Sequence, residues 1–117
     1  AKKQARWQQL AISACEQCQR NRLPIMAAPM DLADWLEQNQ SQWRLVLHHR
    51  KAEGLPRQAS VGSLSLLIGP EGGLSEPEIT SARDRHFKPL TLGPRVLRTE
   101  TAPVAAISLV QYLWGDF

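Results

Sequence analysis

The sequence predicts an α/β fold in which a parallel β-sheet carries helices on both faces. Short strand patterns alternate with helical patterns from Trp43 onward. This β-α-β-α order implies parallel strands joined by right-handed crossovers. The strand pattern at 64–68 is apolar except at Ser65, as is typical of strands covered on both faces. Two apolar runs stop abruptly at Gly69 and Gly93, and the chain then returns to a helical pattern.

The spacing of apolar residues sets the predicted elements. Helices are expected over 2–19, 31–38, 75–86 and from 99–103 to 114, and strands over 43–48, 64–68 and 88–92. One face of the first helix carries apolar residues at intervals of three and four: Trp7, Leu10, Ala11, Ala14, Cys15 and Cys18. The last helix is apolar over most of its circumference, so we expect it to be buried inside the domain, against a partner, or both.

The start of the third helix has a capping signature. Ser75 can accept a hydrogen bond from the backbone N–H of Glu78, and the Glu78 carboxylate can reach back to the backbone of Ser75. Pro77 is tolerated in the first turn, where its missing N–H costs nothing. The sequence therefore predicts a capping box at this position.

Cys15 and Cys18 form a Cys-x-x-Cys spacing within the first predicted helix. A redox pair usually follows a strand, and a zinc site needs further ligands that the sequence does not supply. Both cysteines also lie on the apolar face, so core packing is the favoured interpretation. Two unpaired cysteines without a secretory signal predict a reducing, cytoplasmic location.

Composition sets wide limits. A chain of 117 residues with 43% hydrophobic residues can form one domain with a core. Its longest apolar runs are too short to span a bilayer. The net charge of +3 is compatible with a nucleic-acid partner without requiring one. Since the chain begins at Ala1 within a helical pattern, we expect it to be a fragment of a longer protein.

The two glycine-containing runs predict one ligand cleft at the carboxyl ends of adjacent strands. Glycine at Gly69 and Gly93 allows close approach of backbone to a ligand, because no Cβ intervenes. The Gly69–Gly73 loop lacks the Gly-Lys-Ser/Thr ending of a P-loop and the spacing of a dinucleotide fingerprint. A tight turn and a ligand loop therefore remain equally open for this segment.

Polar residues beside these loops have two interpretations. Arg95, Arg98 and Glu100 form either a solvated turn or a cationic site for phosphate or developing negative charge. His48 and His49 end the first strand, either as ordinary polar strand-end residues or as contacts to RNA or substrate. The sequence contains no pattern typical of a Ser/His/Asp triad or a metal cluster.

Two long motifs point to a known family. The first is Ile68-Gly69-Pro70-Glu71-Gly72-Gly73 with Glu78-Ile79, and the second is Leu92-Gly93-x-Arg95-Val96-Leu97-Arg98-Thr99-Glu100-Thr101-Ala102. Upstream, Arg6-Trp7 and Ile12-Ser13-Ala14-Cys15-Glu16-Gln17-Cys18-x-Arg20-Asn21-Arg22 also match. With these motifs the chain resembles, over nearly its whole length, the RsmE-type 16S rRNA uridine N3-methyltransferases of the SPOUT superfamily.

The resemblance implies a trefoil-knot methyltransferase domain that is partial here, without its first strands and without the PUA-like RNA-binding domain that precedes it in the family. It implies S-adenosylmethionine as cofactor, 16S rRNA of the small ribosomal subunit as substrate, a homodimer, and no metal or membrane. Backbone groups would hold the cofactor at Leu47, Ile68, Gly69, Glu71, Gly72, Leu92, Gly93 and Leu97. Catalysis would involve Arg98 and Glu100, and RNA contacts would involve His48 and Arg95.

Two other functions remain compatible with the sequence. A ribose 2′-O-methyltransferase would share the knot and the cofactor, and its product nucleoside would differ. A non-catalytic RNA-binding or assembly module would bind RNA without affinity for S-adenosylmethionine.

Overall fold

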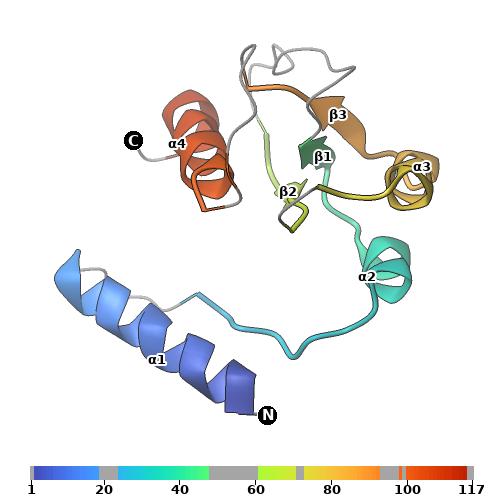
Figure 1. Cartoon of the computed structure of the whole chain (residues 1–117). Coiled ribbons are helices and arrows are strands. Elements are labelled where there is room, and N and C mark those ends of the chain that lie inside the picture. Colours follow the sequence, from blue (N-terminus) through green and yellow to red (C-terminus); the bar gives the residue numbers. More distant parts are fainter. Residues whose placement is uncertain are drawn as a thin grey trace. The chain divides into compact units, whose positions relative to one another are not determined.

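The computed structural model describes residues 2–18, 24–47, 61–70, 73–92, 98 and 100–115. The chain divides into two compact units, Ala1–Asp34 and Trp35–Phe117, and each is described by itself. Figure 1 shows the elements in chain order: α1 (Lys2–Gln17), α2 (Leu32–Gln38), β1 (Trp43–Leu47), β2 (Leu64–Leu67), α3 (Glu76–Asp84), β3 (Lys88–Leu90) and α4 (Ala102–Trp114). Every predicted helix and strand is present; the ends predicted at residue 19 and at His48 lie outside the described residues.

Helix α1 dominates the first unit. Cys15 is buried, as the core interpretation predicts. That interpretation is wrong for Cys18, which is exposed one residue beyond the end of α1, with its thiol 3.7 Å from the carbonyl oxygen of Cys15. Both cysteines are free thiols. Trp7 and Leu10 on the same face are also exposed. Only part of the apolar face of α1 is therefore buried.

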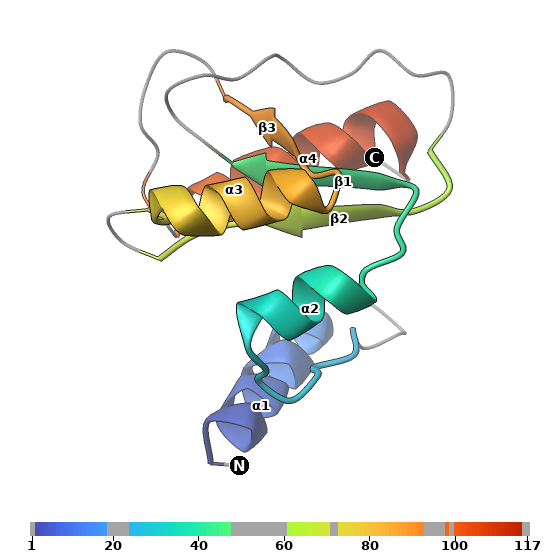
Figure 2. The same ribbon diagram turned by 90° about the vertical axis from the view of Figure 1, so that its right-hand side faces the viewer.

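The second unit is built on a three-stranded sheet in the order β2-β1-β3, with both strand pairs parallel. Helices α3 and α4 cover opposite faces of this sheet (Figure 2). The predicted fold class, a parallel α/β sheet with helices on both faces, is therefore confirmed. β1 is central in the described sheet, and the Leu45 and Val46 side chains are its most buried positions, at 1% and 0% exposure.

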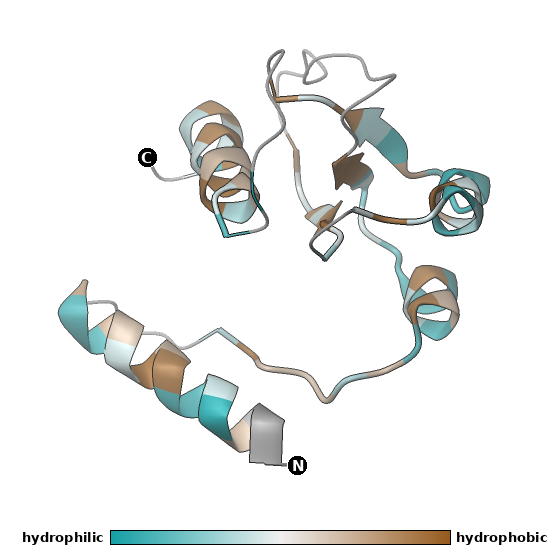
Figure 3. Ribbon diagram, in the orientation of Figure 1, coloured by the Kyte–Doolittle hydropathy of each residue, from teal (hydrophilic) through white to brown (hydrophobic). Residues whose placement is uncertain are grey.

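Apolar side chains from the helices close both faces of the sheet. Trp35 of α2 lies 5.6 Å from Phe87, measured between ring centroids. The buried set around the sheet consists of Leu36, Ile79, Ala82, Phe87, Leu90, Ala102 and Ala106. Figure 3 shows the corresponding alternation, with apolar residues concentrated on β1 and β2 and polar residues on the outer side of α3.

Strand β2 departs from the prediction of a strand covered on both faces. All four of its residues are half-buried, because β2 lies at one edge of the described sheet and solvent reaches it. Its polar residue is satisfied: the Ser65 hydroxyl accepts a hydrogen bond from the Asn39 side-chain amide at 2.7 Å and also bonds to the Ser41 hydroxyl. This network fixes the loop between α2 and β1 against β2.

Helix α3 begins at the predicted capping box. The backbone N–H of Glu78 donates to the Ser75 hydroxyl at 3.3 Å, and the Ser75 N–H donates to the Glu78 carboxylate at 2.8 Å. Pro77 occupies the first turn. These bonds satisfy helix-end donors that have no partner within the helix, and they set the direction in which the chain leaves the loop after β2.

The other end of α3 is closed by a left-handed residue. His86 has φ of 69°, a conformation usually taken by glycine. The N–H of His86 donates to Arg83 and the N–H of Phe87 donates to Ala82, both at 3.0 Å. This is the pairing of a Schellman motif. It turns the chain directly from α3 into β3 and buries Phe87.

Replacing Ser75 with alanine is expected to lower the free energy of unfolding by about 1 kcal/mol, the usual cost of losing an N-cap side chain. The hydrogen bond from the Ser75 backbone is the main cause that lowers the pKa of Glu78. The ionised Glu78 carboxylate therefore stabilises the fold above the ordinary glutamate pKa. This stabilisation is lost as the pH falls through the lower pKa that Glu78 has in the folded state. Urea unfolding at neutral and acidic pH measures both effects. The box contributes nothing if Ser75→Ala unfolds at the parental midpoint.

Candidate functional site

The carboxyl edge of the sheet, formed where the three strands end, is the candidate site. Val46 pairs with Leu67, and Leu47 pairs with Leu90, so the strands end side by side. Ile68 follows the last residue of β2, and Leu92 lies two residues beyond β3; both are half-buried. Ligands of open α/β sheets bind at this edge.

One detail of the predicted cleft is wrong. The two loop motifs do not follow adjacent strands, because β1 lies between β2 and β3 in the sheet. Leu47, at the end of β1, therefore occupies the central position of the edge, between the ends of β2 and β3. The sequence could not show this order, since packing between segments that are distant along the chain decides which strands are neighbours.

The loop after β2 is folded around its own glycines. The N–H of Gly73 donates to the carbonyl oxygen of Pro70 at 2.8 Å, and Gly73 has φ of 82°, which favours glycine. A Cβ added at Gly69 would lie 2.8 Å from the backbone nitrogen of Leu74. The space that a Cβ would take on Gly69 is thus filled by Gly73 and Leu74, so the fold of the loop itself requires glycine there.

Leu74 helps to fix the loop after β2, a function that the motifs in the sequence did not indicate. Its backbone and side chain both pack within 2.9 Å of the position a Cβ would take on Gly69. The sequence does hold a signal for it: an apolar residue stands between the last loop glycine and the N-cap Ser75. Leu74 precedes the N-cap of α3 and packs against Gly69, which follows β2. It therefore ties the start of α3 to the end of β2.

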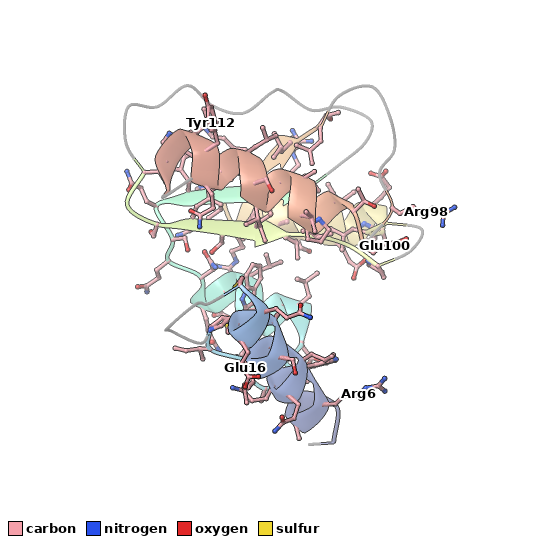
Figure 4. The ribbon with its side chains drawn as sticks, turned by 90° about the vertical axis from the view of Figure 1, so that its left-hand side faces the viewer. Arg6, Glu16, Arg98, Glu100 and Tyr112 are labelled. Carbon is pink, nitrogen blue, oxygen red and sulfur yellow. The ribbon has the colours of Figure 1, made fainter. Side chains whose placement is uncertain are left out.

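Arg98 and Glu100 lie at the turn into α4, as predicted. The Arg98 carbonyl accepts hydrogen bonds from the N–H groups of Thr101 and Ala102, at 3.0 and 2.9 Å. The Arg98 guanidinium lies 4.0 Å from the Glu100 carboxylate, and these side chains are 87% and 65% exposed. Both extend outward from the turn (Figure 4). An ion pair that is so exposed to solvent adds little to the stability of the fold. The same exposure leaves the Arg98 guanidinium accessible to an anion.

The remaining predicted site residues lie outside the described residues. They are His48, Glu71, Gly72, Gly93, Arg95 and Leu97. Within the part of the chain that the structure describes, no group of three His, Cys, Asp or Glu residues could hold a metal ion. The same described residues include no helix long and apolar enough to cross a membrane.

A parallel sheet with helices on both faces defines an α/β domain, and in such domains the carboxyl edge is the usual ligand site. The family model of the RNA methyltransferase domain matches residues 1–111. The chain therefore belongs to the RNA methyltransferase domain family.

Named relatives narrow this class. The chain is 39% identical, over 114 residues, to the ribosomal RNA small subunit methyltransferase E of Buchnera aphidicola subsp. Acyrthosiphon pisum, a match that covers 96% of this chain and 45% of that protein. It is 37% identical over 121 residues to the protein of the same name from Bacillus subtilis, covering 95% of this chain and 47% of that protein. The chain thus spans about half the length of the curated relatives it matches.

Two solved structures share the fold. A crystal structure of ribosomal RNA small subunit methyltransferase E from Neisseria gonorrhoeae, bound to S-adenosyl methionine, matches with a TM-score of 0.93 and 42% identity, covering 99% of this chain and 50% of that one. A putative methyltransferase from Legionella pneumophila, in complex with the cofactor SAM, matches with a TM-score of 0.94 and 39% identity, covering 99% of this chain and 48% of that one.

Proposed function

We propose that this chain is the cofactor-binding part of an S-adenosylmethionine-dependent methyltransferase that modifies uridine N3 in 16S rRNA of the small ribosomal subunit. The observation that carries the proposal is the agreement of its fold, at TM-scores of 0.93 and 0.94, with two methyltransferases that hold this cofactor. The carboxyl edge of the sheet supplies a suitable place, because the apolar ends of the three strands lie side by side there.

The residues of this edge fit the cofactor's chemistry. Adenine offers hydrogen-bonding atoms and a flat apolar ring, which suit backbone groups framed by leucine and isoleucine side chains. The backbone positions proposed for the cofactor are Leu47, Ile68, Gly69, Glu71, Gly72, Leu92, Gly93 and Leu97. Of these, Gly69 acts by shaping its loop, since its own Cβ space is filled by Leu74.

The proposed reaction moves a methyl group from a sulfonium to a uracil nitrogen. S-adenosylmethionine, when bound, supplies an electrophilic methyl group. The protein must hold N3 in line with it and favour loss of the N3 proton, because the protonated nitrogen is a poor nucleophile. Arg98 is proposed to stabilise the negative charge that then spreads over uracil. Glu100, 4.0 Å away, is proposed to orient that guanidinium. His48 and Arg95 are proposed to contact RNA.

Further properties of the proposed enzyme follow from the family resemblance. They are a trefoil knot in the domain, a PUA-like RNA-binding domain as a separate part of the whole protein, and work in the cytoplasm. This chain is proposed to be the later part of the SPOUT methyltransferase domain, consistent with its span of about half of its relatives.

Analysis of the modified nucleoside tests the reaction. The full-length enzyme carrying this domain should convert uridine in small-subunit rRNA into 3-methyluridine. Recovery of 2′-O-methyluridine would assign the ribose alternative instead. RNA binding without any methyl transfer would assign the non-catalytic alternative.

A homodimer through α4 is also proposed. One side of this helix is buried against the sheet through Ala102 and Ala106. The rest remains apolar and exposed, with Val104, Ile107, Leu109, Tyr112 and Leu113 all uncovered. Tyr112 projects outward from α4 (Figure 4). The sequence predicts that this helix is buried inside the domain, against a partner, or both. Burial inside the domain accounts for only one side of it. A second copy of the same helix would cover the other side with matching apolar surface.

Ile107→Glu is expected to convert dimers into monomers, because Ile107 is 52% exposed and would place a carboxylate in an apolar contact. Sedimentation over a range of concentrations measures the change. Ser81→Glu, which adds the same charge to an exposed position of α3, is the control and should remain dimeric. A parental chain that sediments as a monomer at high concentration contradicts the dimer.

A further inference from the structure

We propose that the amino edge of the sheet is a second RNA-contacting surface, where Arg44, Arg85, His86 and Lys88 bind backbone phosphates away from the methyl-transfer site. These four residues are called the amino-edge patch below. The inference rests on the proposed function, which makes RNA the substrate. An RNA substrate extends well beyond the single nucleotide that is modified, so the enzyme meets phosphates at more than one place.

Contacts in the structure hold two members of the patch, Arg44 and Lys88, at the amino edge of the sheet. The Arg44 guanidinium donates through Nη1 to the carbonyl oxygen of Arg85 at 2.9 Å, and through Nε to that of Ser41 at 3.1 Å. The Lys88 ammonium lies 4.8 Å from the centre of the Trp43 ring. Trp43 and Arg44 are neighbours at the start of β1. Because successive residues of a strand point to opposite faces of the sheet, Arg44 reaches this edge from one face and Lys88, which contacts Trp43, from the other.

Arg44 is fixed in a useful orientation. Two of its N–H groups are held by backbone carbonyls, and a guanidinium has five N–H donors. The remaining donors are therefore presented from an anchored side chain, which loses less entropy when it binds an anion. Arg85, His86 and Lys88, in the segment that leads from α3 into β3, are exposed.

The patch has little compensating negative charge. Asp84 is the one acidic residue between 81 and 92, and Glu37 is the one between 35 and 47. Among the residues that the structure describes, the ion pair within 4.0 Å joins Arg98 and Glu100, so the cations of the patch are not neutralised by carboxylates. Of the three acidic residues of α3, Glu76 and Glu78 lie in its first turn, at the opposite end of the helix, and Asp84 alone lies in its last turn, next to Arg85 in the sequence.

Stability alone does not explain this cluster. A cation near the C-terminus of α3 interacts favourably with the helix dipole, which accounts for Arg83 in the last turn. It does not account for Lys88, which belongs to β3, or for a histidine at 86, where φ of 69° would suit glycine better.

The location separates the patch from the cofactor. Trp43, Arg44 and Lys88 begin their parallel strands, whereas Leu47 and Leu90 end them. Along the five residues of β1 this separates the two edges by about 13 Å. Changes in the patch should therefore leave cofactor binding intact.

The test is a salt titration of RNA binding. Fluorescence anisotropy with a labelled fragment of small-subunit rRNA would compare the parental chain with Arg85→Gln/Lys88→Gln. We expect the double variant to bind more weakly by a similar factor for RNAs of different sequence. The slope of log K against log salt should fall by about 0.7 for each phosphate that the variant no longer binds. Lys3→Gln/Arg6→Gln, which removes two positive charges from α1, is the matched control and should retain the parental slope.

The outcomes separate the patch from the proposed function. Parental affinity and slope in Arg85→Gln/Lys88→Gln would overturn the patch, as would a parental chain that binds the RNA without salt dependence. A calorimetric titration with S-adenosylmethionine is run on the same proteins. Loss of RNA affinity with normal cofactor binding supports the patch. Absence of cofactor binding in the parental chain contradicts the proposed function, whatever the RNA result.

Discussion

Arg98→Ala is expected to lower kcat for rRNA methylation by about 10²–10³-fold, the usual cost of losing one donor aimed at charge that develops in the transition state. The affinity for S-adenosylmethionine should change little. The side chain of Arg98 is 87% exposed, so its removal leaves the packing of the fold unchanged. Its effect should therefore appear in the chemical step.

The assay uses the full-length enzyme that carries this domain, with small-subunit rRNA as substrate. Single-turnover methylation measures the chemical step, and calorimetry measures cofactor binding. Arg98→Lys keeps the charge but loses the planar fork of donors, so it should recover part of the rate. Glu100→Gln should cost less than Arg98→Ala, since Glu100 acts through Arg98. If Arg98→Ala methylates at the parental rate, Arg98 is a turn residue only, and Arg95 becomes the next candidate.

Gly69→Val should weaken binding of S-adenosylmethionine by more than tenfold, or ~1.4 kcal/mol. The Cβ would lie 2.8 Å from the Leu74 nitrogen and 3.0 Å from the Gly73 carbonyl carbon. These are backbone atoms, and they are held in place by the Gly73–Pro70 hydrogen bond and by the capping box. The loop must therefore move away from β2, which displaces the backbone groups proposed to meet the cofactor.

Gly62→Val is the matched control for this prediction. A Cβ at Gly62 would approach only the end of the flexible Gln42 side chain, at 3.0 Å, and Gly62 lies before β2, near the amino edge of the sheet. This variant should bind the cofactor normally. Circular dichroism establishes that both variants are folded. Normal cofactor binding by a folded Gly69→Val would exclude the loop after β2 from the site.

The sequence was sufficient for features that depend on local chemistry. Ser75, Pro77 and Glu78 define the start of α3 by hydrogen bonds within four residues, and the structure contains these bonds. The parallel sheet followed in the same way from strand and helix periods. Strand order did not follow, because β1 is placed between β2 and β3 by packing between distant segments.

The candidate site shows the same division. Leu47, Ile68 and Leu92 reach one edge of the sheet as the motif spacing predicts. The function of Gly69 could not be deduced, since the sequence shows that a Cβ is missing but not which atom fills its place. The amino-edge patch was also missed. Its members are separated by about forty residues along the chain, from Arg44 to Arg85, and the pairing of β1 with β3 and the Arg44 hydrogen bond to the Arg85 carbonyl bring them to one edge.

The central claim is that the carboxyl edge of this sheet binds S-adenosylmethionine, and isothermal titration calorimetry of the chain with that cofactor tests it most directly. The account predicts saturable binding to one site per chain, reduced by more than tenfold, or ~1.4 kcal/mol, in Gly69→Val and unchanged in Gly62→Val. A folded parental chain that gives no binding heat at any temperature tested, and no change in melting temperature with the cofactor, would contradict it.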